Sequence, residues 1–359
     1  MAYTTIDDPT IYFNTKLYTG NGAVGGDSTT ISSLDFAPNL VWIKNRTTSG
    51  DATSSHALTD TVRGVTKTLS SNLNTAEATY SNALTNFSSN GFTVSDKAIV
   101  NGNGNSLVAW NWKAGTSVSG DTGGSGTAKT YTGSVNTDAG FSIIRYIGNG
   151  TAGHTIPHHL GTTPALVIAR TISVAKDWNV YHHKNTSAPE TEVLVLNTTA
   201  ATADDLGVWN DTAPTSSVVT LGDSSQLNTN DGTCIMYAFS EKQGYSKFGS
   251  YTGNGNADGT FVYTGFKPAW VMTKKTNSTS QWVMFDNKRS PINYVQRRLQ
   301  ANNSAAENTD DNQDFDILSN GFKSRRAAGD WNSSGDTFIY MAFAENPFVT
   351  STGVPACAR

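Results

Sequence analysis

The segment Ser106-Leu107-Val108-Ala109-Trp110-Asn111-Trp112 has two counterparts in the chain, residues 233–239 and 337–343, and each is an apolar run that ends in an aromatic residue. Two further motifs accompany it each time. A Tyr-x-Gly-Asn-Gly turn starts at Tyr18, Tyr146 and Tyr251. A proline-led apolar strand follows at 38–44, 164–170 and 268–274. A repeat of this length indicates a duplicated domain rather than a short solenoid unit.

Side chains alternate in size along the three apolar runs. The large set comprises Val108, Trp110, Trp112, Ile235, Tyr237, Phe239, Ile339, Met341 and Phe343, and the intervening residues are smaller and mixed. Because alternate residues of a strand face opposite sides of its sheet, we expect a central strand. Its bulky side is buried in a core, and its lighter side is covered by a second layer or a neighbouring domain. The sequence therefore predicts an all-β protein of three tandem β-sandwich repeat domains, jelly-roll or lectin-like, with short helical insertions.

The repeat spacing also divides the chain into segments. We expect an N-terminal docking arm at 1–15, repeats at 16–117, 138–245 and 246–347, a flexible Gly/Ser/Thr-rich linker at 118–137, and a C-terminal tail at 348–359. The arm is too short to have a core of its own, yet it carries Ile11, Tyr12 and Phe13. These three side chains are predicted to dock the arm, either on its own domain or on a neighbouring subunit.

Local signals add short elements to this scheme. The best helical signals lie at 74–83 and 304–309, which occupy the same place in the first and third repeats. The pairs Asn90-Gly91 and Asn320-Gly321 stand between apolar residues, so each predicts a hairpin.

A cation stands six residues after the proline of each proline-led strand. These cations are Lys44, Arg170 and Lys274. A charge at the end of a strand blunts edge pairing or marks where the strand reaches the surface. We therefore favour a structural role for these positions over ligand binding.

The composition limits the classes of function. Charged residues are only 15 % of the 359 residues, and the formal net charge is −4, so there is no basic surface for nucleic acid. Two cysteines cannot form a disulfide framework, and Cys234 and Cys357 are expected as free thiols. The first residues lack the basic and apolar regions of a signal peptide, and no apolar run approaches the length of about eighteen residues that spans a membrane. We expect folding in a reducing cytoplasm and no membrane insertion.

Motifs for catalysis or metal binding are weak. The pairs His158-His159 and His182-His183 would each point to opposite faces of a strand, so neither pair predicts a metal site. Asp310, Asn312 and Asp314 resemble the start of a calcium loop, but Phe315 stands where such a loop needs glycine, so no calcium site is predicted.

Carboxylates and nucleophile motifs give no enzyme signal either. Glu192, Glu241 and Glu345 are the candidate carboxylates for glycan hydrolysis. Glu241 and Glu345 occupy equivalent places in two different repeats, so they would not converge on one glycosidic bond. No nucleophile elbow, phosphate-binding loop or dinucleotide fingerprint occurs. We therefore predict a protein without catalytic residues.

Aromatic residues in polar surroundings are the better candidates for binding. Trp178, Tyr181, Trp209, Trp282 and Trp331 stand among polar residues rather than in apolar runs. Partly exposed Trp and Tyr are typical of carbohydrate and protein interfaces. We select Trp178, Tyr181, Trp209 and Trp331 as candidate contact residues. The alternative is that each ring packs under its own loop.

Several segments together resemble a known family. These segments are Tyr3-Thr4-Thr5-Ile6-Asp7-Asp8-Pro9, 38–44, Asp60-Thr61-Val62-Arg63-Gly64-Val65, Asn90-Gly91-Phe92-Thr93-Val94, 108–115 and Phe343-Ala344-Glu345-Asn346-Pro347-Phe348. They resemble virion proteins of tailed phages, common in marine and cyanobacterial phages, that are built of repeated β-domains. The second repeat departs from the pattern, with Lys184-Asn185-Thr186 in place of the Val-Arg-Gly segment. The family brings no catalytic residues.

The resemblance implies a non-enzymatic structural component exposed on the particle, either a tail fibre or adhesin or a capsid decoration protein. It would be assembled in the host bacterial cytoplasm and located in the virion. Its expected partners are other virion proteins (portal, tail or major capsid protein) and copies of itself, with a trimer as the expected state. Two alternatives remain open: a lectin-like receptor-binding protein for host surface glycans, and a glycan depolymerase.

Overall fold

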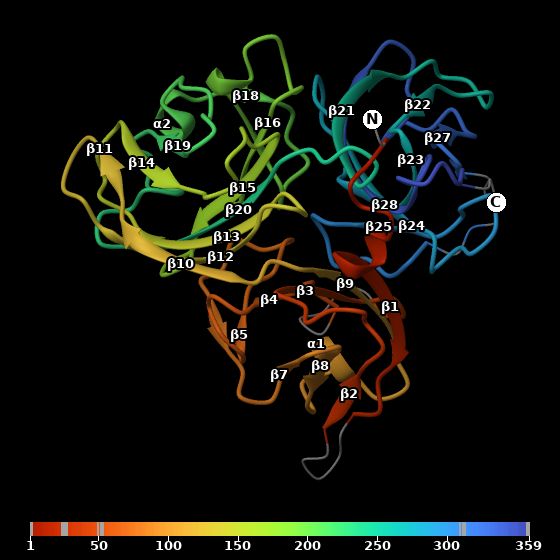
Figure 1. Cartoon of the computed structure of the whole chain (residues 1–359), viewed down its shortest axis with the longest axis horizontal. Coiled ribbons are helices and arrows are strands. Elements are labelled where there is room, and N and C mark those ends of the chain that lie inside the picture. Colours follow the sequence, from red (N-terminus) through yellow and green to blue (C-terminus); the bar gives the residue numbers. More distant parts are fainter. Residues whose placement is uncertain are drawn as a thin grey trace.

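The computed structural model describes residues 3–22, 28–48, 50, 54–308, 310 and 314–356. Antiparallel strands dominate it, and they form three lobes around a common centre (Figure 1). The chain is therefore mainly β, as predicted. No helix among the described residues is both long and apolar enough to cross a membrane.

Lobe 1 contains two sheets that enclose one apolar cluster. The larger sheet has the order β1 (Phe13–Thr19), β9 (Ser106–Trp112), β3 (Leu40–Asn45) and β4 (Ala57–Asp60). The smaller has the order β2 (Thr29–Ile31), β8 (Gly91–Val94) and β7 (Leu84–Ser88). The remaining elements are the pair β5 (Lys67–Thr68) and β6 (Ala78–Thr79), the helix α1 (Ala98–Asn101) and the 3-10 turn η1 (Pro9–Ile11).

Lobe 3 repeats this plan. Its larger sheet has the order β21 (Ser246–Thr252), β28 (Thr337–Pro347), β23 (Phe266–Lys275), β24 (Val283–Asp286) and β25 (Arg298–Gln300). Its smaller sheet has the order β22 (Phe261–Tyr263), β27 (Gly321–Ser324) and β26 (Phe315–Leu318). The two predicted Asn-Gly hairpins are confirmed as the turns between β7 and β8 and between β26 and β27.

Lobe 2 has the same central strands and additional ones at both edges. Its eight-stranded sheet has the order β10 (Thr116–Asp121), β12 (Thr130–Asn136), β13 (Phe141–Ile147), β20 (Thr233–Phe239), β15 (Leu166–Thr171), β16 (Asn179–His182), β17 (Glu192–Val195) and β18 (Ala203–Asp204). Its smaller sheet has the order β11 (Gly123–Gly124), β14 (His154–Pro157) and β19 (Val218–Leu221). The lobe also contains the 3-10 turn η2 (Pro189–Thr191) and the helix α2 (Leu206–Trp209).

Two local predictions are wrong. The segment 118–137, expected to be a flexible linker, contains most of β10 together with β11 and β12. Tyr131 and Val135 are buried in the lobe 2 cluster, and Val118 packs against it, so burial of these side chains holds the added strands in place. The segments 74–83 and 304–308 are not helical, and the short helices lie elsewhere.

The three recurring strands β9, β20 and β28 explain the alternation in side-chain size. All nine bulky side chains belong to a single core that is shared by the three lobes. The smaller side chains on the opposite face, such as Ala109, Met236 and Ala342, belong to the separate clusters of the individual lobes. The largest side chains of these strands therefore pack between the lobes, and the smaller side chains on the opposite face pack inside their own lobe.

Candidate functional site

Main-chain carbonyls at the lobe boundaries accept hydrogen bonds from three buried rings. Each ring immediately precedes the strand that pairs with the proline-led strand of its lobe, β4, β16 or β24, so the three positions are equivalent. The bonds join His56 Nε2 to Gln300 O (3.0 Å), Trp178 Nε1 to Ser70 O (2.8 Å) and Trp282 Nε1 to Val195 O (3.0 Å). Lobe 1 thus donates to lobe 3, lobe 3 to lobe 2, and lobe 2 to lobe 1. The contacts form a closed cycle.

The proline-led strands supply a second cycle in the same direction. Lys44, Arg170 and Lys274 are fully buried, so the expectation that they lie at the surface is wrong. Lys44 Nζ reaches Ser304 O (3.4 Å), Lys274 Nζ donates to Thr199 O (3.1 Å), and the Arg170 guanidinium donates to the carbonyls of Leu73, Asn74 and Thr75 (3.1, 2.7 and 2.8 Å). Burial lowers the pKa of Lys274 to about 8 and that of Arg170 to about 10. These cations cap loops of the neighbouring lobe.

A third set of equivalent positions carries Asp60, His182 and Asp286. Asp60 Oδ2 accepts from Tyr237 Oη (2.7 Å) and Asp286 Oδ2 accepts from Trp110 Nε1 (3.1 Å), again across lobe boundaries. Each carboxylate is also paired with an arginine three residues later, Arg63 or Arg289. His182 Nε2 donates instead to Tyr340 O (3.1 Å). Burial lowers the pKa of His182 to about 3, so the ring is neutral at neutral pH.

The repeated Tyr-x-Gly-Asn-Gly turn is also structural. Its tyrosine hydroxyls donate to Val100 O (2.6 Å), Leu227 O (2.6 Å) and Trp331 O (2.7 Å) in the three lobes. The first glycine of each turn lies against the main chain. A Cβ there would stand 2.2, 2.3 or 2.2 Å from a carbonyl oxygen at Gly20, Gly148 or Gly253. Only glycine fits such a close approach.

The structure places the predicted contact aromatics in the interior. Trp178, Trp209, Trp331 and Tyr181 are 0, 1, 3 and 4 % exposed, so the expected partial exposure is wrong. Each ring packs beneath loops or at a lobe boundary, as the alternative proposed. Both N–H groups of Trp178 are satisfied by residues far away in the sequence, because its main-chain N–H donates to Asn197 Oδ1 (2.8 Å) and its ring N–H to Ser70 O.

The N-terminal arm docks on its own chain. Phe13 is buried in the shared core, where its ring stacks on Phe343 at 5.1 Å, and Tyr12 meets Tyr245 at 5.8 Å. Ile11 closes the 3-10 turn η1 and is half-buried. Further back, Tyr3 Oη donates to Gly265 O (2.6 Å) of lobe 3, and Figure 1 shows the arm starting beside that lobe.

The remaining candidates are dispersed. Within the described residues no group of three or more His, Cys, Asp or Glu side chains could hold a metal ion. Of the residues considered for a calcium site, Asn312 lies outside the described residues, and the Asp314 carboxylate forms ion pairs with Arg298 and Arg326. Glu241 pairs with Lys247 (3.4 Å) and Glu345 with Lys267 (3.2 Å) at separate places. Burial raises the pKa of Cys234 to about 11, so its thiol is protonated at neutral pH.

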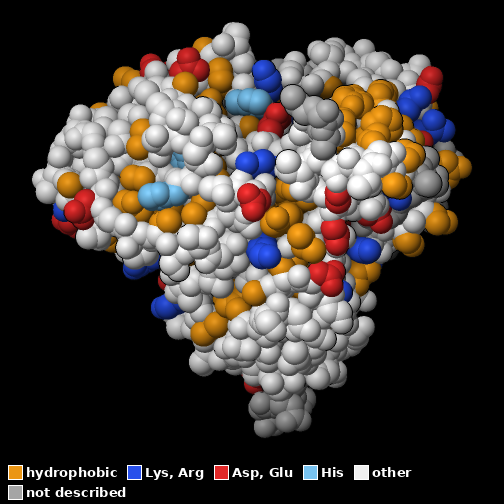
Figure 2. Space-filling view, viewed as in Figure 1, with side chains coloured by type: hydrophobic (Ala, Val, Ile, Leu, Met, Phe, Trp, Pro, Cys, Tyr) orange, Lys and Arg blue, Asp and Glu red, His pale blue; other side chains and the backbone are white. Residues whose placement is uncertain are grey.

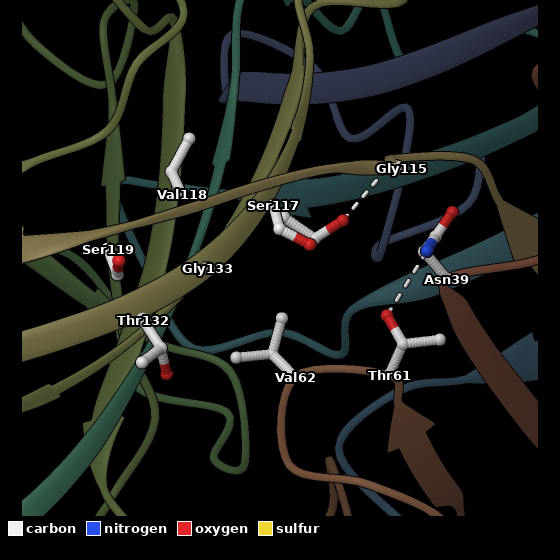
Figure 3. Close-up of a pocket in the computed structure, with 10 residues that line it drawn as sticks. Asn39, Thr61, Val62, Gly115, Ser117, Val118, Ser119, Thr132 and Gly133 are labelled. Atoms are coloured by element: carbon white, nitrogen blue, oxygen red, sulfur yellow. Dashed lines mark hydrogen bonds between the residues drawn. The ribbon is translucent and has the colours of Figure 1, made fainter.

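Two surface grooves could accept ligands. The first, of about 460 Å³, lies between the turn after β4 and the paired strands β10 and β12 (Figure 3). Asn39 Nδ2 donates to Thr61 Oγ1 (3.1 Å) at one wall, and Gly115 N donates to Ser134 Oγ (2.8 Å) at the other. Its described lining offers hydroxyl, amide and main-chain groups beside Val62 and Val118, and no ionisable side chain.

The second groove, of about 440 Å³, combines rings and charges. We call it the tyrosine groove, and it is lined by Tyr3, Glu241, Gln243, Gly244, Ser246, Lys247, Tyr263, Thr264 and Gly265. Tyr263 is 52 % exposed, and its hydroxyl lies 3.4 Å from that of Tyr3. This mixture of an accessible ring, a carboxylate, an amide and an ammonium suits a polar organic ligand better than the neutral groove does.

A comparison with protein families matches residues 8–347 to a domain of unknown function, DUF7483. The chain belongs to the DUF7483 family. No significant match was found among curated proteins or among solved structures.

The DUF7483 match spans all three lobes, so the family unit is the whole three-lobed assembly. Tyr263 lies inside the matched range, whereas Tyr3 precedes it. The sequence reasoning missed both residues. A comparison of the three copies at the strand after the Gly-Asn-Gly turn could have found Tyr263, since only the third copy has aromatic residues there.

Proposed function

We propose that the protein is a non-enzymatic structural component of a tailed-phage virion, exposed on the surface of the particle as a tail-associated part or a capsid decoration protein. The segments that resemble repeated β-domain virion proteins support this proposal. We also propose that each lobe is a β-sandwich domain of jelly-roll or lectin-like type, because its two antiparallel sheets enclose an apolar cluster of its own.

The observation that carries the proposal is the closed cycle of contacts between lobes. Equivalent rings, cations and carboxylates, which are the chemically versatile side chains of the repeat, all serve to join one lobe to the next. Three copies joined in this way give a stiff body with loops and edge strands on its outside. Such a body suits a part that bears load and presents surfaces within an assembly.

The partners that this role requires are other virion proteins (portal, tail or major capsid protein) and further copies of the chain. One chain already contains three copies about its centre, so it could occupy a threefold position alone or as part of a homo-oligomer. Mass spectrometry of purified particles, followed by cryo-electron microscopy, tests the proposal. We expect the chain at stoichiometric levels on the outside of the head or tail. Its absence from purified particles would refute the proposal.

A second candidate function, binding of host surface glycans, is favoured by one specific observation. The tyrosine groove lies beside β22, whose outward face carries two exposed aromatic side chains, Phe261 and Tyr263. A glycan-binding appendage would still be a virion component, so the two functions are compatible. The experiment below separates them.

A further inference from the structure

The strand β22 differs from its counterparts in the other lobes. In each lobe the strand after the Gly-Asn-Gly turn carries one buried apolar residue, and these are Ile31, Ile156 and Val262. They are equivalent because each pairs with a residue of the adjacent strand in its three-stranded sheet, namely Phe92 of β8, Val219 of β19 or Phe322 of β27. The residues on either side of them face away from the lobe interior.

Only the third lobe places aromatic residues at these outward positions. Lobe 1 has Thr30 and Ser32, and lobe 2 has Thr155 and Pro157. Lobe 3 has Phe261 and Tyr263, which are 45 and 52 % exposed. The fold therefore forms without rings at these positions, so a structural need does not explain them. Because the two residues are two positions apart on a strand, their side chains leave the same face from Cα atoms about 7 Å apart.

The N-terminal arm completes the site beside these rings. Tyr3 Oη donates to Gly265 O (2.6 Å), and Thr4 Oγ1 donates to Gln243 O (2.7 Å). Gly265 has φ +81°, and a Cβ there would lie 2.7 Å from Tyr3 Oη, so glycine is needed for the arm to dock. Figure 2 shows hydrophobic side chains gathered on the surface of this lobe, at the upper right.

Two charged groups in the lining of the groove are held by contacts of their own. Glu241 Oε1 accepts from Phe248 N (3.0 Å), and Glu241 Oε2 lies 3.4 Å from Lys247 Nζ. Both side chains keep part of their surface exposed, 32 and 41 % respectively. Main-chain and ion-pair contacts thus orient a carboxylate and an ammonium whose remaining hydrogen-bonding capacity faces solvent.

This combination matches the chemistry of a sugar ring. One face of a pyranose presents C–H groups, which pack on the electron-rich face of a tyrosine or phenylalanine ring. Its hydroxyl groups both donate and accept, so they can bond to a carboxylate and an ammonium at the same time. The core of a protein–protein interface is instead depleted of charged residues. The charges beside Tyr263 therefore favour a glycan over a protein partner.

We infer that the tyrosine groove, extended by Phe261, is a carbohydrate-binding site that takes a short stretch of a polysaccharide. Tyr263 and Phe261 stack against successive sugar rings, and Tyr3, Glu241, Gln243 and Lys247 bond to their hydroxyl groups. This inference deepens the glycan-binding candidate and does not depend on the position of the protein in a particle.

Binding of the full chain to an array of purified bacterial O-chain and capsular polysaccharides tests the site, with calorimetric titration of the bound oligosaccharide. Tyr263→Ala is expected to weaken binding at least about tenfold, whereas Tyr263→Phe keeps the ring and should stay within about threefold of the parent. Tyr294→Ala is the matched control, because Tyr294 is another exposed aromatic residue (40 %) of lobe 3 that does not line the groove. Periodate cleavage of the sugar diols should abolish binding.

The inference is overturned if the parent protein binds no polysaccharide on the array, or if Tyr263→Ala binds as tightly as Tyr294→Ala. Thermal unfolding of each variant separates loss of the site from loss of the fold. A protein that is found in purified particles but is negative on the array would refute the carbohydrate site alone. A protein that binds glycans but is absent from particles would refute only the virion role.

Discussion

The Tyr237 hydroxyl donates a 2.7 Å hydrogen bond to Asp60 Oδ2, and this bond joins lobe 2 to lobe 1 inside the shared core. Asp60 is fully buried, and its other contacts are the Arg63 guanidinium and the main-chain N–H groups of Val62 and Arg63. These three donors, together with the Tyr237 hydroxyl, hold the carboxylate in place and fix the turn that follows β4. The bond therefore couples the packing of one lobe to a local turn of another.

Loss of this bond should destabilise the whole protein. Tyr237→Phe removes one donor to a buried carboxylate and changes the packing little, so we expect a loss of about 1–3 kcal/mol in the free energy of unfolding. Urea titration measures the change. Tyr294→Phe removes a hydroxyl from an exposed ring and should change stability by less than about 0.5 kcal/mol. Equal stability of the two variants would contradict the role assigned to Tyr237.

Arg170 should hold the main chain of lobe 1 in place. Arg170→Met keeps much of the apolar stem but leaves the carbonyls of residues 73–75 without their guanidinium donors. The neighbouring amides of Glu77 and Lys176, which bond to Ile172 O and Asn74 O across the same boundary, should then exchange hydrogen faster. Hydrogen exchange with mass spectrometry checks this. Arg145→Met, at an exposed arginine of β13, should leave both amides unchanged.

His182 should make the protein acid-sensitive. Its pKa is about 3 in the folded protein, below the ordinary value of 6.5, so between these pH values the unfolded chain binds a proton that the folded chain does not. Stability therefore falls as the pH falls from 6.5 towards 3, by about 1.4 kcal/mol per pH unit for this one group. His182→Gln keeps a donor for Tyr340 O but does not titrate. Its stability, measured by urea titration from pH 4 to 7, should depend less steeply on pH by about one proton, and equal slopes would refute the prediction.

Gly91 should tolerate no side chain. An alanine Cβ there would lie 1.9 Å from Ile31 O, so β2 and β8 would have to separate, at a cost of about 3 kcal/mol or more. Gly329 is exposed and has no atom within 4 Å of the corresponding position, so Gly329→Ala should change stability by less than about 0.5 kcal/mol. Thermal unfolding compares the two variants. A mild effect at Gly91 would show that the strands can move apart.

The sequence predicted the elements whose cause is local. Alternation in side-chain size identified β9, β20 and β28, and the Asn-Gly pairs identified two hairpins, because these patterns reflect the geometry of a single strand or turn. Gly91, however, is needed for its close approach to Ile31 and not for the turn itself, which Ser89 and Asn90 form. The Asn-Gly pair thus predicted the hairpin correctly, although this glycine is required by the contact between strands and not by the turn.

Predictions that depended on the surroundings of a residue failed. Lys44, Arg170 and Lys274 looked like surface charges, and Trp178 looked exposed, because their partners are carbonyl groups of another lobe that no sequence pattern identifies. The strands β10 and β12 looked like a linker because their Gly/Ser/Thr composition does not indicate the sheet to which they add. The tyrosine groove could not be predicted from the sequence, because three separate segments form it: the N-terminal arm, the turn that follows β20, and the end of β22. They come together only in the folded chain.

The cycle of contacts also sets an order of events on the ribosome. The His56 ring cannot form its hydrogen bond until Gln300, which follows it by 244 residues, has been synthesised. Lobe 1 therefore emerges without its contacts to lobe 3. At a synthesis rate of about 5–20 residues per second, the delay is roughly 10–50 s. During that time Lys44, His56 and the bulky face of β9 have no lobe 3 to cover them. Lobe 1 is therefore made before lobe 3 but completes its boundary only after lobe 3 has been made.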